Sequence, residues 1–275
     1  MERLDRLGWA AGSSFTSFGV RIGLRTTDPS VMPRLEEVLP PGWKPSTVQT
    51  VPHLYSLVAG GPGDRKGTRR LWVLYDGWVR VARHREFEPV LEALESMLRA
   101  TVAEHAPRRV FVHAGVVGWK GKAIVIPGRS FSGKSTLVAE LVKAGASYYS
   151  DEYAVIDAQG RVHPFHAPMS IRVPGSYEGT DHEAEAFGGK KGSKPLRIGL
   201  VVASEYKDGA NWRPRKLSPA EGALAMLANT VSARRAPETA LSTLRAALGG
   251  AVVLKGKRGE ASEVAASLLS EAESA

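Results

Sequence analysis

A glycine-rich stretch that ends in a lysine and a hydroxyl holds the residue types best suited to chemistry. Residues 128–135 are Gly-Arg-Ser-Phe-Ser-Gly-Lys-Ser, the G-x-x-x-x-G-K-S pattern of a phosphate-binding loop, or Walker A motif. In such loops, backbone amides and the N-terminus of the next helix converge on an anion. Lys134 is expected to reach the β- and γ-phosphates, and the Ser135 hydroxyl is expected to bind Mg²⁺. The pattern therefore predicts binding of a nucleotide such as ATP, together with Mg²⁺.

The flanking sequence places this loop between a strand and a helix. Residues 123–126 are apolar and predict a buried strand, while apolar residues over 137–142 share one face of a helix that Gly145 would end. The alternative is a glycine-rich turn that binds no ligand. If the loop does bind phosphate, the contacting residues are expected to be Gly128, Ser130, Ser132, Gly133, Lys134, Ser135 and Thr136.

Three further side chains could assist a phosphoryl transfer. Asp151 and Glu152 follow the predicted helix, so the returning chain can bring them back to the phosphate end. A carboxylate there could take a proton from an attacking hydroxyl, and its neighbour could hold Mg²⁺ directly or through water. His113, in an apolar run upstream, could tune the pKa of that base or share its proton. The competing interpretations are a solvated turn for the acidic pair and a hydrogen-bonded core residue for the histidine.

Asp157 is a rival carboxylate, because it ends the apolar run at 154–156. Its position is similar to that of the strand-terminal acid that holds Mg²⁺ in other ATPases with such a loop. Composition and spacing do not choose between Asp151 and Asp157.

Composition limits the class of protein. The 275-residue chain has a net charge of +9 and no cysteine, which excludes disulfides, thiolate zinc sites and cysteine nucleophiles. No apolar run approaches the length of a membrane span, and the N-terminus lacks a hydrophobic signal core, so a cytoplasmic protein without membrane contact is expected. The basic residues are scattered and no nucleic-acid recognition motif is present. We therefore interpret the charge as a solvated surface that attracts phosphate substrates.

The pattern of strands and helices suggests two regions. Residues 1–105 predict an α+β region with a strand over 14–28, a hairpin around Asp76-Gly77 and a helix over 87–105. This region is either a separate domain or an extension of the following sheet. Residues 106–275 alternate strands and helices around the loop, and residues 174–196, which are polar and without period, predict a long surface loop.

The run from His113 through Glu152 resembles the catalytic core of HPr kinase/phosphorylase and its relatives. In that family, a histidine–glycine-type segment precedes a β-hairpin that leads to the G-x-x-x-x-G-K-S loop, a helix, a glycine and an acidic pair. The same order is found here in His113-Ala114-Gly115, residues 116–126, the loop 128–135, residues 137–143, Gly145 and Asp151-Glu152. The resemblance implies an α/β fold, namely a phosphoenolpyruvate-carboxykinase-like P-loop fold with a mixed sheet flanked by helices.

The resemblance also implies roles for individual residues. Asp151 would be the general base that activates the acceptor hydroxyl, supported by His113, while Lys134 would act on the phosphates. Ser135 and Glu152 would hold Mg²⁺, although Glu152 stands where the family usually has a second aspartate. Residues 1–105 do not resemble the N-terminal domain of the HPr enzymes, so the chain is similar to their relatives rather than to the HPr enzyme itself.

Together these features predict an ATP- and Mg²⁺-dependent kinase that transfers the γ-phosphoryl group to a hydroxyl, with serine of a protein or peptide as the first choice. One alternative is a regulatory module that binds the nucleotide without transferring phosphate. Another is a small-molecule kinase whose pocket the N-terminal region shapes. The family enzymes are oligomers, so a homo-oligomer is expected, but no stretch identifies an interface, an acceptor or a reverse phosphorolysis.

Overall fold

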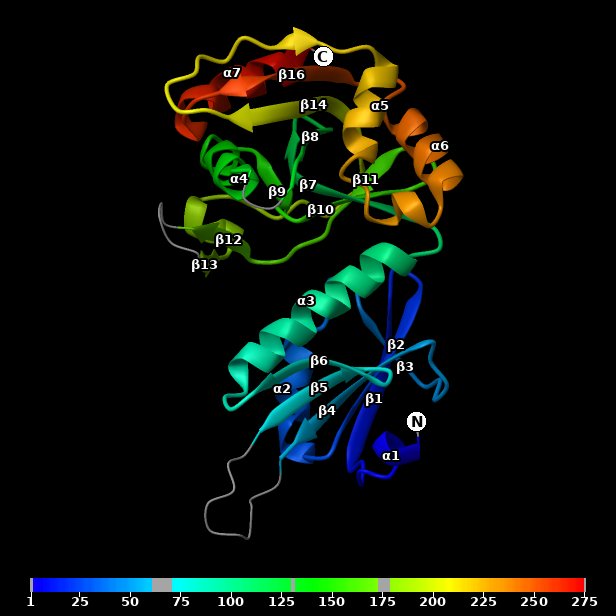
Figure 1. Ribbon diagram of the computed structural model, residues 1–275. Coiled ribbons are helices and arrows are strands. Elements are labelled where there is room, and N and C mark those ends of the chain that lie inside the picture. The colour runs from blue at the N-terminus through cyan, green and yellow to red at the C-terminus, as the bar shows by residue number, and fades with distance from the viewer. Residues whose placement is uncertain (1, 61–70, 130–131, 173–178, 275) are drawn as a thin grey trace. The chain divides into compact units, whose positions relative to one another are not determined.

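The chain divides into two compact units, Met1–Pro107 and Arg108–Ala275. The computed structural model describes residues 2–60, 71–129, 132–172 and 179–274 (Figure 1). Each unit has a sheet of its own, so the N-terminal strands do not extend the sheet that carries loop 128–133. Within the described ranges, no helix is long and apolar enough to cross a membrane.

The N-terminal unit is a six-stranded sheet with the order β3-β1-β2-β4-β5-β6. The expectation of one strand over 14–28 is wrong, because Phe18 and Gly19 both have positive φ and turn the chain into a hairpin. A two-residue turn of that kind matches the twist of the strands it joins. The hairpin around Asp76-Gly77 is confirmed. The strands are β1 Ala11–Ser17, β2 Val20–Thr26, β3 Lys44–Ser46, β4 His53–Ala59, β5 Trp72–Asp76 and β6 Val79–His84.

One long helix, α3 Glu88–His105, confirms the amphipathic helix expected over 87–105. Its buried face consists of apolar residues three and four apart, including Leu91, Leu94 and Leu98. The Tyr55 hydroxyl of β4 and the Thr101 hydroxyl of α3 hydrogen-bond at 2.7 Å, which ties the helix to the sheet. The shorter helices of this unit are α1 Glu2–Asp5, η1 Pro29–Val31 and α2 Met32–Glu37.

The C-terminal unit contains an eight-stranded mixed sheet in which β8, β14 and β16 run parallel as neighbours. The other pairings in this sheet are antiparallel. Because parallel strands end at the same edge, the carboxyl ends of β8, β14 and β16 lie together, and loop 128–133 begins there. The strands are β7 Val110–Trp119, β8 Lys122–Pro127, β9 Ser147–Ser150, β10 Tyr153–Ile156, β11 Arg161–His163, β14 Leu196–Tyr206, β15 Arg215–Lys216 and β16 Val252–Arg258.

Helices cover both faces of this sheet (Figure 1). One apolar core joins the sheet to α4 Lys134–Lys143 and α7 Ala261–Ser274. A second core joins the other face to α5 Pro219–Leu227 and α6 Pro237–Ala247, with η3 Val231–Arg234 between these two helices. The expected α/β class, with a mixed sheet flanked by helices, is confirmed. Ser218 and Glu221 form a capping box at the start of α5.

The long surface loop expected over 174–196 is wrong in part. Residues 174–178 lie outside the described residues, but the remainder contains a strand, β13 Gly179–His182, and a short helix, η2 Ala184–Phe187. Strand β13 pairs with β12 Met169–Arg172. The segment packs through glycines instead of a periodic apolar face: a Cβ at Gly189 or Gly192 would come within 2.1 Å of Val142 or 2.0 Å of Tyr149. Backbone packing of this kind leaves no hydrophobic period in the sequence.

Gly160 provides a test of how α6 packs on the sheet. It has a φ of 75°, and a Cβ there would come within 2.6 Å of backbone atoms of Ala246 and Ala247. Gly121 has a φ of 81° with nothing within 4 Å, so Gly121→Ala is a matched control. We expect Gly121→Ala to lower the free energy of unfolding by about 1 kcal/mol, the usual cost of a left-handed residue. Gly160→Ala should cost at least about 3 kcal/mol, because α6 must also move.

Urea unfolding followed by circular dichroism measures both free energies. Equal losses in the two variants would contradict the close packing of α6 against the turn between β10 and β11.

Candidate functional site

Strand β7 positions the candidate site, because three strands pair with it around Ala114. On one edge, Pro127 at the end of β8 lies opposite Ala114. On the other edge, β10 pairs with the first part of β7 and β9 with its last part, so these two strands lie end to end. Asp151 and Glu152 connect them, and the Ala114 N–H donates to the Glu152 carbonyl at 3.1 Å. The start of the loop and the acidic pair therefore flank the same point of β7.

The loop between β8 and α4 is held at both ends by its backbone. The Gly128 N–H donates to the His113 carbonyl at 3.1 Å, which extends the β7–β8 pairing into the loop. Gly133 is the N-cap of α4 in the left-handed conformation, with a φ of 76°. A residue with a Cβ is strained in that conformation, which accounts for the second glycine of the motif. Ser130 lies outside the described residues, so its predicted phosphate contact stays a prediction.

Lys134 opens α4 and bends back over the loop. Its Nζ donates to the carbonyl of Arg129 at 2.7 Å. Burial lowers the pKa of Lys134, and the charges of Asp151 and Glu152 partly offset that shift. The lysine therefore lies within electrostatic reach of both acids. A phosphate oxygen entering the loop would compete with the Arg129 carbonyl for the ammonium group, and a charged acceptor gives the stronger hydrogen bond.

Asp151 is a buried carboxyl, with only 8% of the residue exposed. Burial raises its pKa, while polar contacts from the Ser135 and Tyr148 hydroxyls and the Ser170 backbone lower it in part. The Tyr148 hydroxyl lies 3.2 Å from Asp151 Oδ1 and 2.6 Å from the Ala167 carbonyl. A carboxylate with a raised pKa is a better proton acceptor than a solvated one. Asp151 thus has the environment of a general base next to the loop serine.

His113 lies beside this group rather than deep in the apolar core. Its ring packs against Tyr153 in a tilted arrangement, with a centroid distance of 4.7 Å and an interplanar angle of 35°. Burial lowers its pKa, the nearby Lys134 charge lowers it further, and a polar contact with the Glu152 backbone raises it in part. These effects together favour the neutral imidazole. The structure brings together five of the predicted residues: His113, Lys134, Ser135, Asp151 and Glu152.

Asp157 lies at the end of β10 that is far from the loop. Strand β10 runs away from the loop along β7, so that Tyr153 pairs with His113 while Ile156 pairs with Val110 at the far end of their pairing. Asp157 follows Ile156, is 2% exposed, and contacts His163 at 2.8 Å and Arg161 at 3.0 Å. Burial alone would raise its pKa, but these hydrogen bonds outweigh burial and lower it to about 2. Asp157 stabilises the β10–β11 turn, so between the two aspartates the geometry favours Asp151 as the acid beside the loop.

The residues present fit a phosphate with Mg²⁺. Ser132 Oγ is buried without a hydrogen-bond partner among the described residues, which leaves one hydroxyl of the loop available to a ligand. No group of three or more His, Asp or Glu side chains in the described ranges could hold a metal ion by itself. Mg²⁺ commonly takes one or two protein ligands and completes its shell with phosphate oxygens and water. Ser135, with Asp151 in polar contact and Glu152 next in the chain, is such a partial set.

Arg258 is a contact of the loop that the sequence did not reveal. It is the last residue of β16, and its Nη2 donates to the Gly133 carbonyl at 2.9 Å. Nothing in the motif points to it, because 125 residues separate the two partners. The sequence shows only that an arginine follows a predicted strand. That this strand runs parallel to β8, and so ends near the loop, is decided by the folded sheet.

No protein-family model matches the chain, and no curated protein matches it either.

Tyr148 and Tyr149 provide a matched pair for testing the environment of Asp151. We expect Tyr148→Phe to raise the Asp151 pKa further, because the ionised carboxylate loses a donor. Tyr149→Phe should leave that pKa unchanged, since the Tyr149 hydroxyl donates instead to the Lys194 carbonyl at 2.8 Å. Carbon-detected NMR titration of the aspartate carboxyl groups measures the shift. A pKa that responds equally to both changes would contradict the contact between Tyr148 and Asp151.

Proposed function

We propose that this protein is an ATP- and Mg²⁺-dependent kinase that transfers the γ-phosphoryl group to a hydroxyl, with serine of a protein or peptide as the expected acceptor. One observation carries the proposal: a buried carboxyl with a raised pKa, Asp151, lies beside the lysine and serine of a G-x-x-x-x-G-K-S loop at a strand-to-helix turn. The resemblance of residues 113–152 to the HPr kinase/phosphorylase family supports the same reaction and a P-loop fold.

In the proposed reaction, the acceptor oxygen forms a bond to the γ-phosphorus while the bond between that phosphorus and the β–γ bridging oxygen breaks. Asp151 takes the proton of the hydroxyl, and ADP leaves. Lys134 and the loop amides stabilise the charge on the phosphoryl oxygens, which is the main catalytic contribution expected for this class of reaction. Mg²⁺ bound through Ser135 would neutralise the β- and γ-phosphates.

The directions of the pKa shifts agree with these roles. Asp151 must be ionised to act as a base, so its raised pKa places the acidic limit of activity above the usual range of an aspartate. The lowered pKa of His113 favours the neutral imidazole, which keeps a ring nitrogen able to accept a hydrogen bond. Its carbonyl holds the first residue of the loop, so His113 joins the loop to the acidic pair by backbone as well as by side chain.

Nucleotide binding is tested with the lysine. We expect Lys134→Ala to weaken ATP binding at least about tenfold, because a buried charged hydrogen bond to phosphate is lost. Lys143→Ala is the control, since Lys143 ends the same helix and pairs with Glu140 on the surface. Isothermal titration with ATP and Mg²⁺ measures both affinities. Equal ATP affinity in the wild type and in Lys134→Ala would exclude binding through the loop.

Transfer is tested with the two aspartates. Asp151→Asn should keep ATP affinity within a fewfold and lower γ-phosphoryl transfer by about 10² to 10⁴, the usual contribution of a general base. Asp157→Asn should keep transfer, although it removes about 2 kcal/mol of stability at neutral pH. That stability follows from a pKa lowered to about 2, so it is present above pH 4 and is lost as the pH falls through 2.

Labelled ATP added to a size-fractionated lysate measures the transfer and reports the size class of the acceptor. Binding without transfer, unaffected by Asp151→Asn, would favour the regulatory nucleotide-binding module. Loss of transfer in Asp157→Asn alone would overturn the assignment of the base.

A further inference from the structure

We infer that Arg258 is a positioning residue of the anion site, which holds the last glycine of loop 128–133 and supplies a buried positive charge that a polyphosphate compensates. The inference shares one premise with the proposed function, that the loop binds an anion, but it concerns neither the acceptor nor the general base.

Arg258 connects three segments that are far apart in the sequence. Its Nη2 donates to the Gly133 carbonyl at 2.9 Å, and its Nη1 donates to the Gly259 carbonyl at 3.0 Å. Its guanidinium also lies over the Tyr206 ring, 5.7 Å from the centroid. Tyr206 ends β14 and pairs with Arg258 in the sheet. The guanidinium therefore fastens the loop to the carboxyl ends of both neighbouring parallel strands.

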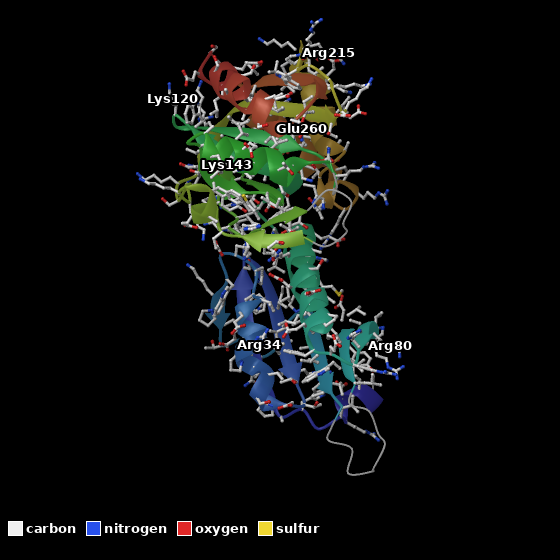
Figure 2. All side chains as sticks on the ribbon, turned by 90° about the vertical axis from the view of Figure 1, so that its left-hand side faces the viewer. Arg34, Arg80, Lys120, Lys143, Arg215 and Glu260 are labelled. Carbon is white, nitrogen blue, oxygen red and sulfur yellow. The ribbon has the colours of Figure 1, made fainter. Side chains whose placement is uncertain are left out.

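The charge of Arg258 has no direct counter-charge in the described residues. The residue is 3% exposed, it forms no ion pair among them, and its Nε is buried without an acceptor. Burial lowers its pKa, while Glu260 and Tyr206 raise it in part. The Glu260 carboxylate instead accepts a hydrogen bond from the Tyr206 hydroxyl at 2.7 Å. Figure 2 labels Glu260 on the turn that leads from Arg258 into α7. A buried cation without an ion pair is unfavourable unless something compensates it.

The position of this charge suggests what compensates it. Gly133 is the N-cap of α4, where helix amides already create positive potential, and Lys134 adds a second cation. Helices usually place acids in their first turn to balance that potential, but α4 has none. Two cations and a helix N-terminus thus converge on one loop. Asp151 and Glu152 lie within electrostatic reach of Lys134, but neither acid contacts Arg258. An inorganic or nucleoside polyphosphate carries several negative charges and can compensate both cations.

The contact also constrains the loop geometrically. A Cβ at Gly133 would lie 2.8 Å from Arg258 Nη2, so a larger residue there would displace the end of the guanidinium from the loop. Arginine suits this role because its planar guanidinium presents several donors in a fixed arrangement, which lets it bridge two carbonyls. Lysine would keep the charge but not the bridge. Arg258→Lys and Arg258→Gln therefore separate the electrostatic contribution from the geometric one.

The test measures how polyphosphate affinity depends on the charge at this position. Isothermal titration of the full chain with inorganic tripolyphosphate, ADP and ATP would compare the wild type, Arg258→Gln and Arg258→Lys. We expect Arg258→Gln to lower the affinities for tripolyphosphate and ATP at least about tenfold. The affinity for ADP should fall less, because the loss grows with the charge of the ligand. Arg258→Lys should recover a large part of the ATP affinity. Arg215→Gln is the control, since Arg215 is exposed and pairs with Glu221 at 3.1 Å.

A second variant keeps the inference testable if Arg258→Gln does not fold. Glu260 is exposed and close enough to Arg258 to affect its pKa. Its negative charge would repel an anion that Arg258 attracts. Glu260→Gln should therefore tighten tripolyphosphate binding by a few fold. Weaker binding in Glu260→Gln would contradict the inference.

The outcomes distinguish this inference from the proposed function. Wild-type protein that binds neither tripolyphosphate nor ATP would overturn both. Wild-type binding that Arg258→Gln leaves unchanged, or weakens equally for all three ligands, would overturn the role of Arg258 in the anion site and leave the proposed kinase intact. A lower melting temperature with unaltered affinities would assign Arg258 to stability alone.

Discussion

The backbone pairing of β7 is the constraint on which the candidate site depends. One strand accepts β8 on one edge and both β9 and β10 on the other, so the loop and the acidic pair are placed by main-chain hydrogen bonds. Helix α4 packs closely on the same part of β7, because a Cβ at Gly115 of β7 would come within 2.5 Å of Val138 of α4. A side chain there would push the helix, and with it Lys134 and Ser135, away from the acids. Strand register and one close helix–strand contact therefore determine where the loop lies relative to the acidic pair.

Burial sets the electrostatics of the groups placed in this way. It is the largest cause of the raised pKa of Asp151 and of the lowered pKa values of His113 and Lys134. The groups also moderate one another, since the charges of the acids favour the protonated lysine and hydroxyl donors favour the ionised aspartate. Loss of one member would leave its partners buried and less well compensated. This mutual dependence is why single substitutions in such a cluster are expected to be non-additive.

Asp151 and Asp157 show how the same residue type acquires different properties six positions apart. Both are almost fully buried, at 8% and 2% exposure. Asp157 accepts hydrogen bonds from Arg161 and His163 in its own hairpin, and its pKa falls to about 2, so it is an anion at neutral pH. Asp151 receives weaker compensation, and its pKa rises. The difference comes from the partners that the hairpin and the loop provide, and no property of the two aspartates themselves would separate them.

The sequence by itself determined the local features of this protein. The spacing of apolar residues predicted α3 and the strand and helix around the loop, and the Asp76-Gly77 pair predicted a hairpin, because each depends on contacts within a few residues. The tertiary structure alone decided which aspartate lies beside Lys134, that residues 179–195 pack through glycines, and that Arg258 reaches Gly133. These features depend on strand order and on contacts across as many as 125 residues, and such contacts leave no periodic trace in the chain.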